Sequence, residues 1–416
     1  TSKQHYLLIS RYLSILPNYS HFPQNLPQFY GNTSLFEPVG LLRGILCYKI
    51  NTLCLTFNTS FVDVQETLSD FRKKINIEIE SHLDKAIKET GRKDALTADT
   101  LKYVKKFTLS GGKRLRAALM YYGYLAVGGR ERKKMLQAAV SVELIHVFLL
   151  IHDDIIDNDK KRHGVDTVSF KYQKLGKKIS PQSDYEHFGN SMAIIIGDIV
   201  GAIGSQIIFD SKFDTKFVFK ALTKLQEIIS MTGIGQSKDI YMEYMGKATE
   251  REILKMYEYK TAKYTIEGPL HLGASLNGAS DKVLENFSEY AIPIVTAFQI
   301  QDDILGIFGS EKKIGKSVGS DIEEGKQTIL VVKAREKSNS KQRKQIDEIL
   351  GKKNVTAKDI EKFQEIIKET GSLDYAADLA RKLINRGKKN IKKMNIDKEA
   401  KTFLIGIADY MVQREL

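Results

Sequence analysis

The segment at residues 142–164, VELIHVFLLIHDDIIDNDKKRHG, constrains the fold of this chain most strongly. Mostly apolar residues at helical spacing lead directly to Asp153, Asp154 and Asp157, and a basic cluster follows. Side chains four positions apart share one face of an α-helix, so Asp153 and Asp157 should project together with Asp154 beside them. Mg²⁺ binds to one or two carboxylates together with substrate phosphates. The segment therefore indicates a divalent-metal site, unless it is an ordinary solvated helix end.

A second apolar helix also ends in adjacent aspartates. Residues 298–309, FQIQDDILGIFG, contain Asp302 and Asp303, and the loop that follows supplies Lys316, Asp321 and Lys326 between glycines. One such cluster is typical of a surface helix with a charged loop. Two clusters that face each other would form a metal cage around one diphosphate.

A basic segment completes a predicted anion site. In SGGKRLR, residues 110–116, Lys113, Arg114 and Arg116 follow a Gly-Gly turn at a predicted helix start. The backbone N–H groups and the dipole at a helix start favour a phosphate, and arginine adds a bidentate fork. Lys260 and Thr261 in YKTAKY add a charge and a hydroxyl, although the pair alone indicates little.

Helical periodicity dominates the chain from Phe61 onward. Strand-like alternation is nearly absent, so we predict one all-α domain. We expect N-caps at Thr97 or Asp99, at Thr356 and at Ser372. The predicted helices span residues 61–90, 101–107, 117–127, 133–157, 187–210, 214–232, 236–246, 249–277, 281–308, 340–350, 357–370, 373–395 and 398–414.

Residues 1–60 differ in composition, with Glu37 as their single acidic residue and no sustained helical period. We expect a poorly ordered extension. Its low acidic content weakly indicates a transit peptide, and a truncated or mis-started reading frame explains it as well. Both cysteines, Cys47 and Cys54, lie here, so we expect neither a disulfide framework nor a cysteine metal site in the main body. This cysteine usage favours a reducing, cytoplasmic location.

The net charge of +13 suits an anionic partner. The lysines are spread over many predicted helix faces, without the interleaved aromatic residues of a nucleic-acid site. We therefore expect no nucleic-acid partner. No window contains 18 uninterrupted apolar residues, so we also expect no transmembrane segment.

The chain contains six motifs in order, which are SGGKRLR, HDDIIDNDKKRHG, GQSKDI, YKTAKY, FQIQDDILGIFG and GKSVGSDIEEGKQT. In this order and spacing they are similar to the motifs of the trans-isoprenyl diphosphate synthases. The resemblance covers roughly residues 65–416, and we assign residues 61–416 to one polyprenyl synthase domain. The second motif most resembles short-chain archaeal-type geranylgeranyl diphosphate synthases. The resemblance implies an all-α homodimer with a central cavity, which joins isopentenyl diphosphate to dimethylallyl, geranyl or farnesyl diphosphate.

The resemblance also implies a role for each site residue. About three Mg²⁺ ions, replaceable by Mn²⁺, would bind the allylic diphosphate. Their implied ligands, catalytic together with Lys260, are Asp153, Asp154, Asp157, Asp302 and Asp303. The same diphosphate would contact Arg162, Lys260, Thr261, Gln299, Lys316 and Lys326. Isopentenyl diphosphate would contact Lys113, Arg116, His146 and His163, with Arg114 also in the substrate-binding set.

Two residues depart from the family pattern. His163 stands where the family usually has arginine, and histidine is shorter and mostly neutral at pH 7. We therefore expect weaker or more pH-sensitive binding of isopentenyl diphosphate. Gly306 stands in place of a third aspartate, and we expect activity to survive that change. We interpret His152 as a packing or supporting residue rather than a metal ligand.

The product length follows from the first acidic helix. Phe148 lies five residues before Asp153, about 7.5 Å along the helix axis. Its ring can form the floor for the growing chain, and the smaller Leu149 beside it is the second predicted chain-length residue. The alternative interpretation is a core phenylalanine without an effect on length. An aromatic here, without an insertion in the acidic motif, resembles producers of C20 chains. We predict geranylgeranyl diphosphate, with farnesyl diphosphate or a longer product as the alternative.

Four other functions fit the sequence less well. A terpene cyclase would not need the predicted isopentenyl site at Lys113 and Arg116. A His/Asp metal-dependent phosphohydrolase could use His152 and Asp153, but the chain offers no convincing set of further histidine ligands. A non-catalytic subunit of a heteromeric synthase usually lacks an acidic motif, and a nucleic-acid binder would rest on charge alone.

Overall fold

The computed structural model describes residues 39–309 and 319–412. The chain divides into two compact units, Thr1–Thr56 and Phe57–Leu416. The first helix, α2 (Val39–Gly91), begins well before Phe61, so the absence of helical structure predicted for residues 39–60 is wrong. This stretch contains no proline, and its many apolar residues tolerate helical geometry. Residues 1–38 and Lys316 lie outside the described residues.

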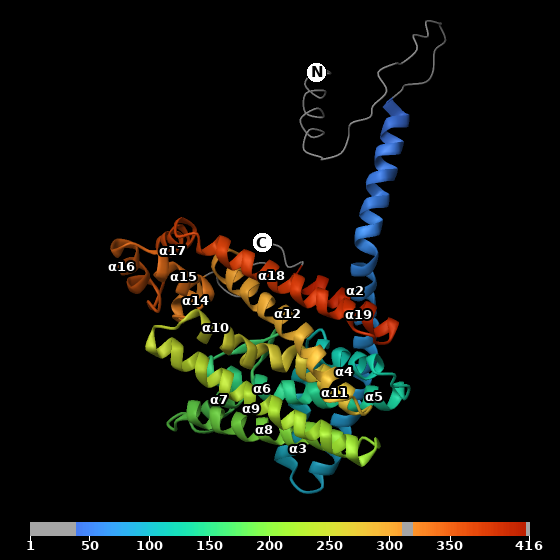
Figure 1. Cartoon of the computed structure of the whole chain (residues 1–416). Coiled ribbons are helices and arrows are strands. Elements are labelled where there is room, and N and C mark those ends of the chain that lie inside the picture. Colours follow the sequence, from blue (N-terminus) through green and yellow to red (C-terminus); the bar gives the residue numbers. More distant parts are fainter. Residues whose placement is uncertain (1–38, 310–318, 413–416) are drawn as a thin grey trace, which may run out of the picture. The chain divides into compact units, whose positions relative to one another are not determined.

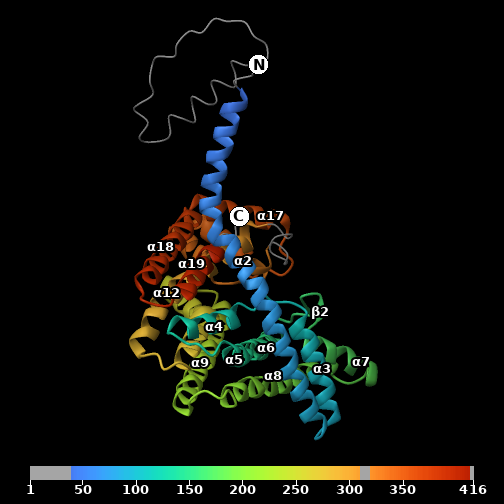
Figure 2. The same cartoon turned by 90° about the vertical axis from the view of Figure 1, so that its right-hand side faces the viewer.

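The unit Phe57–Leu416 is built almost entirely from helices, as Figures 1 and 2 show. The prediction of an all-α fold is confirmed. The helices after α2 are α3 (Ala95–Leu109), α4 (Leu115–Ala126), α5 (Arg132–Ala138), α6 (Val140–Ile156), α7 (Val168–Ile179), α8 (Tyr185–Phe209), α9 (Thr215–Met245), α10 (Glu250–Met256), the π-helix η1 (Tyr257–Glu267), α11 (Gly268–Ser275), α12 (Asp281–Phe308), α14 (Ser320–Glu323), α15 (Ile329–Lys337), α16 (Ser340–Ile349), α17 (Ala357–Glu369), α18 (Ser372–Lys393) and α19 (Lys398–Val412).

The predicted boundaries differ from the structure where packing overrides local propensity. The predicted helix 133–157 is divided at Ala139 into α5 and α6, and the predicted helices 214–232 and 236–246 form the single helix α9. The helices α7, α14 and α15 were not predicted. The N-cap of α3 is Asp94, whose carboxylate accepts the Thr97 N–H, rather than Thr97 or Asp99. Thr356 caps α17 as predicted, but the N-cap of α18 is Gly371 rather than Ser372.

A short hairpin follows the first acidic motif. Its antiparallel strands, β1 (Lys161–Arg162) and β2 (Val165–Asp166), are joined by His163 and Gly164. These two residues have φ angles of 49° and 80°. Two successive positive φ angles are typical of a type I′ turn, in which histidine is tolerated better than most larger side chains. The turn therefore explains how His163 is accommodated.

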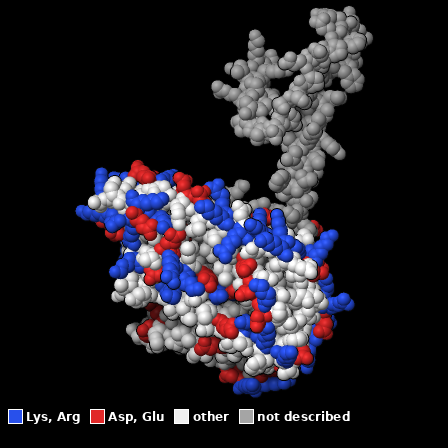
Figure 3. Space-filling view, in the orientation of Figure 1, with Lys and Arg blue, Asp and Glu red and all other residues white. Residues whose placement is uncertain are grey.

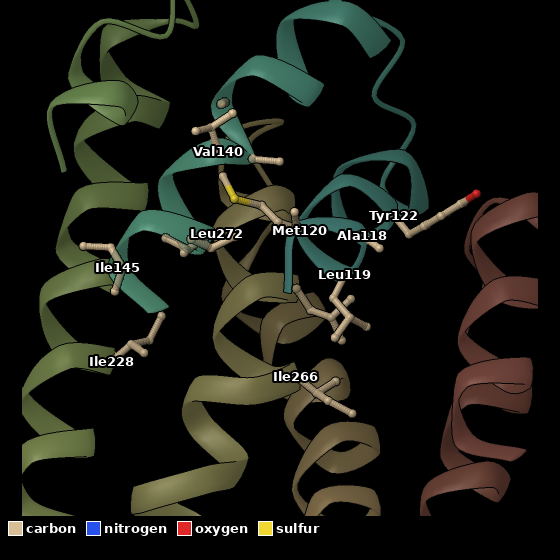
Figure 4. Packing of buried hydrophobic residues seen from close by; sticks show 14 of the residues in the cluster. Ala118, Leu119, Met120, Tyr122, Val140, Ile145, Ile228, Ile266 and Leu272 are labelled. Carbon is tan, nitrogen blue, oxygen red and sulfur yellow. The ribbon is translucent and has the colours of Figure 1, made fainter. Parts of the chain in front are cut away.

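The helices pack around two hydrophobic clusters. In the larger one, α6 packs against α8 and α4 packs against α11. Figure 4 shows Val140 and Ile145 from α6 near Met120 from α4 and Leu272 from α11. The second cluster joins α12 to the C-terminal helices α14–α18. The π-helix η1 contacts both α9 and α12, the second of the two acidic helices.

Three segments of the described chain are long and apolar enough to cross a membrane by length and composition alone. They are Arg132–Ile156, Tyr185–Phe209 and Asp281–Phe308, and 61%, 33% and 56% of their most apolar windows are buried in the fold. The first and third segments thus use their apolar residues mainly in the core. The face seen in Figure 3 intersperses lysine and arginine with aspartate and glutamate rather than showing one basic stripe.

Candidate active site

A cavity of about 430 Å³ brings together much of the predicted site. Its walls come from the α3–α4 loop, α6, the hairpin turn, η1, α12 and the end of α19. The predicted site residues that line it are Lys113, Arg114, Arg116, His146, Arg162, His163, Thr261, Gln299 and Asp302. Residues separated by almost 200 positions in sequence therefore share one cavity.

Asp154 is the buried member of the first acidic cluster. Its Oδ1 accepts a hydrogen bond of 2.7 Å from Arg162 Nε, and its Oδ2 is buried without a hydrogen-bond partner in the described chain. Burial raises the pKa of Asp154 to about 6, against the opposing effect of Arg162. The unpartnered oxygen leaves this carboxylate able to accept another ligand.

Asp157 lies within electrostatic reach of two lysines from distant elements, and one of them, Lys260, also interacts with Asp153. Asp153 Oδ1 accepts a hydrogen bond of 3.3 Å from Gln236 Nε2 on α9. Desolvation, followed by the repulsion of Asp153, raises the pKa of Asp157 to about 6, while Lys260 and Lys326 oppose this rise. The predicted diphosphate ligands Lys260 and Lys326 therefore lie close enough to the first acidic cluster to interact with it electrostatically.

Lys260 is held by a residue that the sequence reasoning did not assign. Its Nζ donates a hydrogen bond to Asp239 Oδ2 on α9. Burial lowers the pKa of Lys260, but Asp239 more than compensates and raises it above its ordinary value. Gly235 permits this approach, because a Cβ there would lie 2.2 Å from Lys260 N. Both Gly235 and Asp239 belong to the GQSKDI motif, so this motif was the sequence signal that could have identified them.

The second acidic cluster is divided between two environments. Asp302 lines the 430 Å³ cavity. Asp303, in contrast, is buried and accepts hydrogen bonds from the Tyr257 hydroxyl and from Gln299 Nε2. Burial raises the pKa of Asp303 to about 8. The structure therefore places Asp302 on the cavity and Asp303 behind it. From the sequence, both aspartates were predicted to be metal ligands, because adjacency along a helix does not show which side chain faces the cavity.

The three basic residues of the segment after α3 differ in what their side chains contact. Arg116 lies over the Tyr264 ring at 4.1 Å, and its Nη2 donates to Thr265 Oγ1 at 3.3 Å. Lys113 is exposed, with its Nζ 4.8 Å from the centre of the Tyr410 ring. Arg114 differs from both, because its Nε and Nη2 donate to Asn76 Oδ1 and the Thr108 carbonyl. The predicted phosphate contact of Arg114 thus competes with bonds to the protein itself.

His146 and His163 both lie on the cavity wall. His146 Nδ1 contacts the Tyr264 hydroxyl, and burial followed by the charge of Arg116 lowers the pKa of His146 well below its ordinary value. Burial followed by the charge of Arg162 also lowers the pKa of His163. Both rings are therefore neutral at pH 7, and each can donate one N–H to an anion.

Lys326 lies between two carboxylates near the second acidic cluster. Its Nζ is 3.0 Å from Asp321 Oδ1 and 2.7 Å from Glu324 Oε2. Burial lowers the pKa of Lys326, but Asp321 and Glu324 raise it overall. A Cβ on Gly306 would lie 2.2 Å from Asp321 Oδ2. Asp321 therefore occupies the space that a side chain at position 306 would need.

The proposed chain-length residue faces α8. Phe148 is half-buried, packs edge-on against His152 with ring centres 4.9 Å apart, and approaches Gly201. Val147 and Leu150 line the 430 Å³ cavity, whereas Phe148 and Leu149 do not. His152 Nε2 contacts the Ile194 carbonyl at 3.2 Å, as a packing residue would. The role of Phe148 in chain length stays a prediction.

The carboxylates do not form a complete metal cage by themselves. Within residues 39–309 and 319–412, no group of three or more His, Cys, Asp or Glu side chains could hold a metal ion. The donors available are nevertheless hard carboxylate oxygens, and Asp154 Oδ2 is buried without a hydrogen-bond partner in that part of the chain. Mg²⁺ typically keeps waters and takes phosphate oxygens beside one or two carboxylates. The residues therefore fit Mg²⁺ that is bound together with a diphosphate.

Comparisons with known proteins agree with this arrangement. The geranylgeranyl diphosphate synthase of Saccharolobus solfataricus is 35% identical over 308 residues, 73% of this chain and 87% of the relative. The geranylgeranyl diphosphate synthase of Methanosarcina mazei is 37% identical over 306 residues, 74% of this chain and 87% of the relative.

The fold is shared with a solved enzyme as well. The crystal structure of geranylgeranyl pyrophosphate synthase from Corynebacterium glutamicum, complexed with isoprenyl diphosphate and magnesium, has a TM-score of 0.77 and 30% identity. The match covers 84% of this chain and 99% of that structure. The family model described as Polyprenyl synthetase matches residues 98–367. The chain belongs to the polyprenyl synthetase family.

Proposed function

We propose that this protein is a geranylgeranyl diphosphate synthase. It condenses isopentenyl diphosphate with dimethylallyl, geranyl and farnesyl diphosphates. The observation that carries this proposal is the convergence of two separate groups of polar residues on one cavity. Lys113, Arg116 and His146 form one group, and Arg162, Gln299 and Asp302 form the other. Two diphosphates can thus bind within reach of each other.

The allylic diphosphate binds at the second group. Arg162, Lys260 and Lys326 are fixed cations close to the first acidic cluster, and Lys316 and Thr261 complete the predicted contacts. When the allylic C–O bond breaks, negative charge grows on the departing diphosphate. Cations already held in position lower this barrier because they do not need to reorganise. About three Mg²⁺ ions, or Mn²⁺ in their place, supply further stabilisation of that charge when they are bound at the aspartates.

Isopentenyl diphosphate binds at the first group. Lys113 and Arg116 neutralise its charge, and the neutral rings of His146 and His163 donate hydrogen bonds. Its double bond then attacks the allylic cation. The condensation ends with loss of a proton, which the released diphosphate is placed to accept. This sequence of steps needs no nucleophilic side chain from the protein.

We also propose that the enzyme is a homodimer that pairs through α8. Ile194 and Ile195 on this helix are 46% and 54% exposed, although α8 is among the most apolar helices of the described chain. A second copy of the chain would remove this apolar area from water. Sedimentation velocity should give a dimer for the wild type and a monomer for Ile195→Glu; a wild-type monomer would contradict the dimer.

The scarcity of cysteine supports a cytoplasmic location.

The activity is tested with purified protein, Mg²⁺, isopentenyl diphosphate and each allylic primer in turn. We expect elongation that ends mainly at the C20 diphosphate, as measured by chromatography of the dephosphorylated products. Absence of elongation with every primer would overturn the proposal. Formation of a cyclic hydrocarbon would instead indicate a terpene cyclase.

A further inference from the structure

Glu143 is a buried carboxylate on α6 that lies outside the two groups of proposed substrate-binding residues. It is 2% exposed and lies ten residues before Asp153 in an otherwise apolar segment. Its Oε1 accepts a hydrogen bond of 3.0 Å from the Ala117 N–H, in the first turn of α4. The first N–H groups of a helix have no partner within the helix, so Glu143 serves α4 as a capping side chain from another element.

The N-cap residue of α4 cannot provide this contact itself. It is Arg114, whose backbone adopts the left-handed conformation with φ 56° and ψ 32° and whose side chain makes no capping hydrogen bond. Non-glycine residues adopt this conformation only where surrounding contacts hold them there. The path of the chain between the two predicted isopentenyl diphosphate ligands, Lys113 and Arg116, is therefore set by tertiary contacts.

The Arg114 guanidinium provides those contacts. It is 5% exposed, and its Nη1 lies 3.4 Å from Glu143 Oε2. Its Nε donates to Asn76 Oδ1 on α2 at 2.8 Å, and its Nη2 donates to the Thr108 carbonyl near the end of α3. Each of its three nitrogens thus has a protein partner. Arg114 and Glu143 together tie the start of α4 to three other helices.

The charges of the segment support the same interpretation. Lys113, Arg114 and Arg116 all lie at the positive end of the α4 dipole, where cations are unfavourable. Glu143 compensates one of these charges by pairing with Arg114. The other two cations remain available to an anion in the cavity.

We propose that the Glu143–Arg114 pair is a positioning device for isopentenyl diphosphate. It does not bind the substrate; it holds the first turn of α4 so that Lys113 and Arg116 project into the cavity together. This inference rests on the proposed function, because it assigns isopentenyl diphosphate to that end of the cavity.

The test compares three variants. Arg114→Met removes the guanidinium, Glu143→Gln removes the charge but keeps an oxygen for the Ala117 N–H, and the third variant combines both changes. Each single change leaves a buried charge without its partner, whereas the double change removes both charges. We therefore expect the melting temperature to fall in the single variants and to recover in the double variant.

The Michaelis constants should not follow the melting temperature. We expect KM for isopentenyl diphosphate to rise at least tenfold in Arg114→Met and in the double variant, and threefold to tenfold in Glu143→Gln. KM for farnesyl diphosphate and kcat should stay within twofold. As a matched control, Thr370→Val removes buried hydrogen bonds to the Ile366 and Ile367 carbonyls beside the second hydrophobic cluster. It should lower stability without changing either KM.

Two results would overturn the proposal. One is a double variant with the wild-type KM for isopentenyl diphosphate, and the other is an equal rise in KM for both substrates. Calorimetric titration with isopentenyl diphosphate alone separates this inference from the proposed function. If the wild type binds isopentenyl diphosphate but elongates no primer, the proposed function fails, and weaker binding by the variants still supports the pair. If the wild type and the variants bind it equally, or none binds it, the inference fails.

Discussion

Restoring a third aspartate at position 306 should impair this enzyme rather than improve it. The family pattern places an aspartate where this chain has Gly306. In the structure, a Cβ at this position would lie 2.2 Å from Asp321 Oδ2 and 3.2 Å from Asp321 Cγ. Such contacts are too short, so the Asp321 side chain would have to turn away. Asp321 would then lose its hydrogen bond of 3.0 Å to Lys326 Nζ.

The expected magnitude follows from that lost contact. A hydrogen bond that involves charged groups contributes about 1.5–3 kcal/mol. If Lys326 then no longer points at the departing diphosphate, this loss appears in the barrier, at about tenfold in rate per 1.36 kcal/mol. The Gly306→Asp variant should therefore show kcat/KM for the allylic primer reduced about 10- to 150-fold. Repulsion between the two carboxylates, about 4 kcal/mol at 4 Å before relaxation, drives the side chains further apart.

The assay is steady-state kinetics with variable farnesyl diphosphate and saturating isopentenyl diphosphate and Mg²⁺. Gly306→Ala tests the steric part alone and should lose about tenfold, at the lower end of that range. The double variant Gly306→Asp with Asp321→Ala removes the conflict and lets the new carboxylate contact Lys326, so it should recover much of the lost activity. A Gly306→Asp enzyme as active as the wild type would refute the reasoning.

Four further predictions follow from the structure. Phe148→Ala should lengthen the product beyond C20 in the chain-length analysis, and Leu149→Ala tests the second predicted chain-length residue; an unchanged product from Phe148→Ala would rule out the floor role. Gly235→Ala should lower kcat/KM at least tenfold, since its Cβ would lie 2.2 Å from Lys260 N, whereas Gly233→Ala on the same helix meets nothing within 4 Å and should be neutral. Burial lowers the pKa of His271, which contacts the Leu284 carbonyl at 2.8 Å, so its neutral form stabilises the fold above the unfolded pKa of about 6.5. That stability should be lost as pH falls below this value, by up to about 1.4 kcal/mol per pH unit in urea unfolding, and His271→Gln should remove this part of the pH dependence. Chelation of Mg²⁺ with EDTA should abolish elongation, and added Mg²⁺ should restore it; elongation that persists in EDTA would contradict the metal role of the aspartates.

Several parts of the site could be predicted because they depend on local pattern. The spacing of Asp153 and Asp157, and the glycines before Lys113, are properties of short segments. Nine predicted residues do line one cavity. The start of α2 was missed because residues 39–60 show no sustained helical period in the sequence, although they are helical in the structure. The continuity of α9 was missed because Gly233 and Gly235 have low helix propensity, which packing against η1 overrides.

The sequence by itself determined the all-α class, the two acidic helices and the family, because helical periodicity and ordered motifs are carried by neighbouring residues. Only the tertiary structure decided what each polar side chain faces. Asp303 is bonded to Tyr257 and Asp302 is on the cavity, although the two are adjacent in sequence. Arg114 is paired with Glu143 while Arg116 lies over Tyr264. The physical reason is that these partners come from other helices, and their distances depend on how the helices pack.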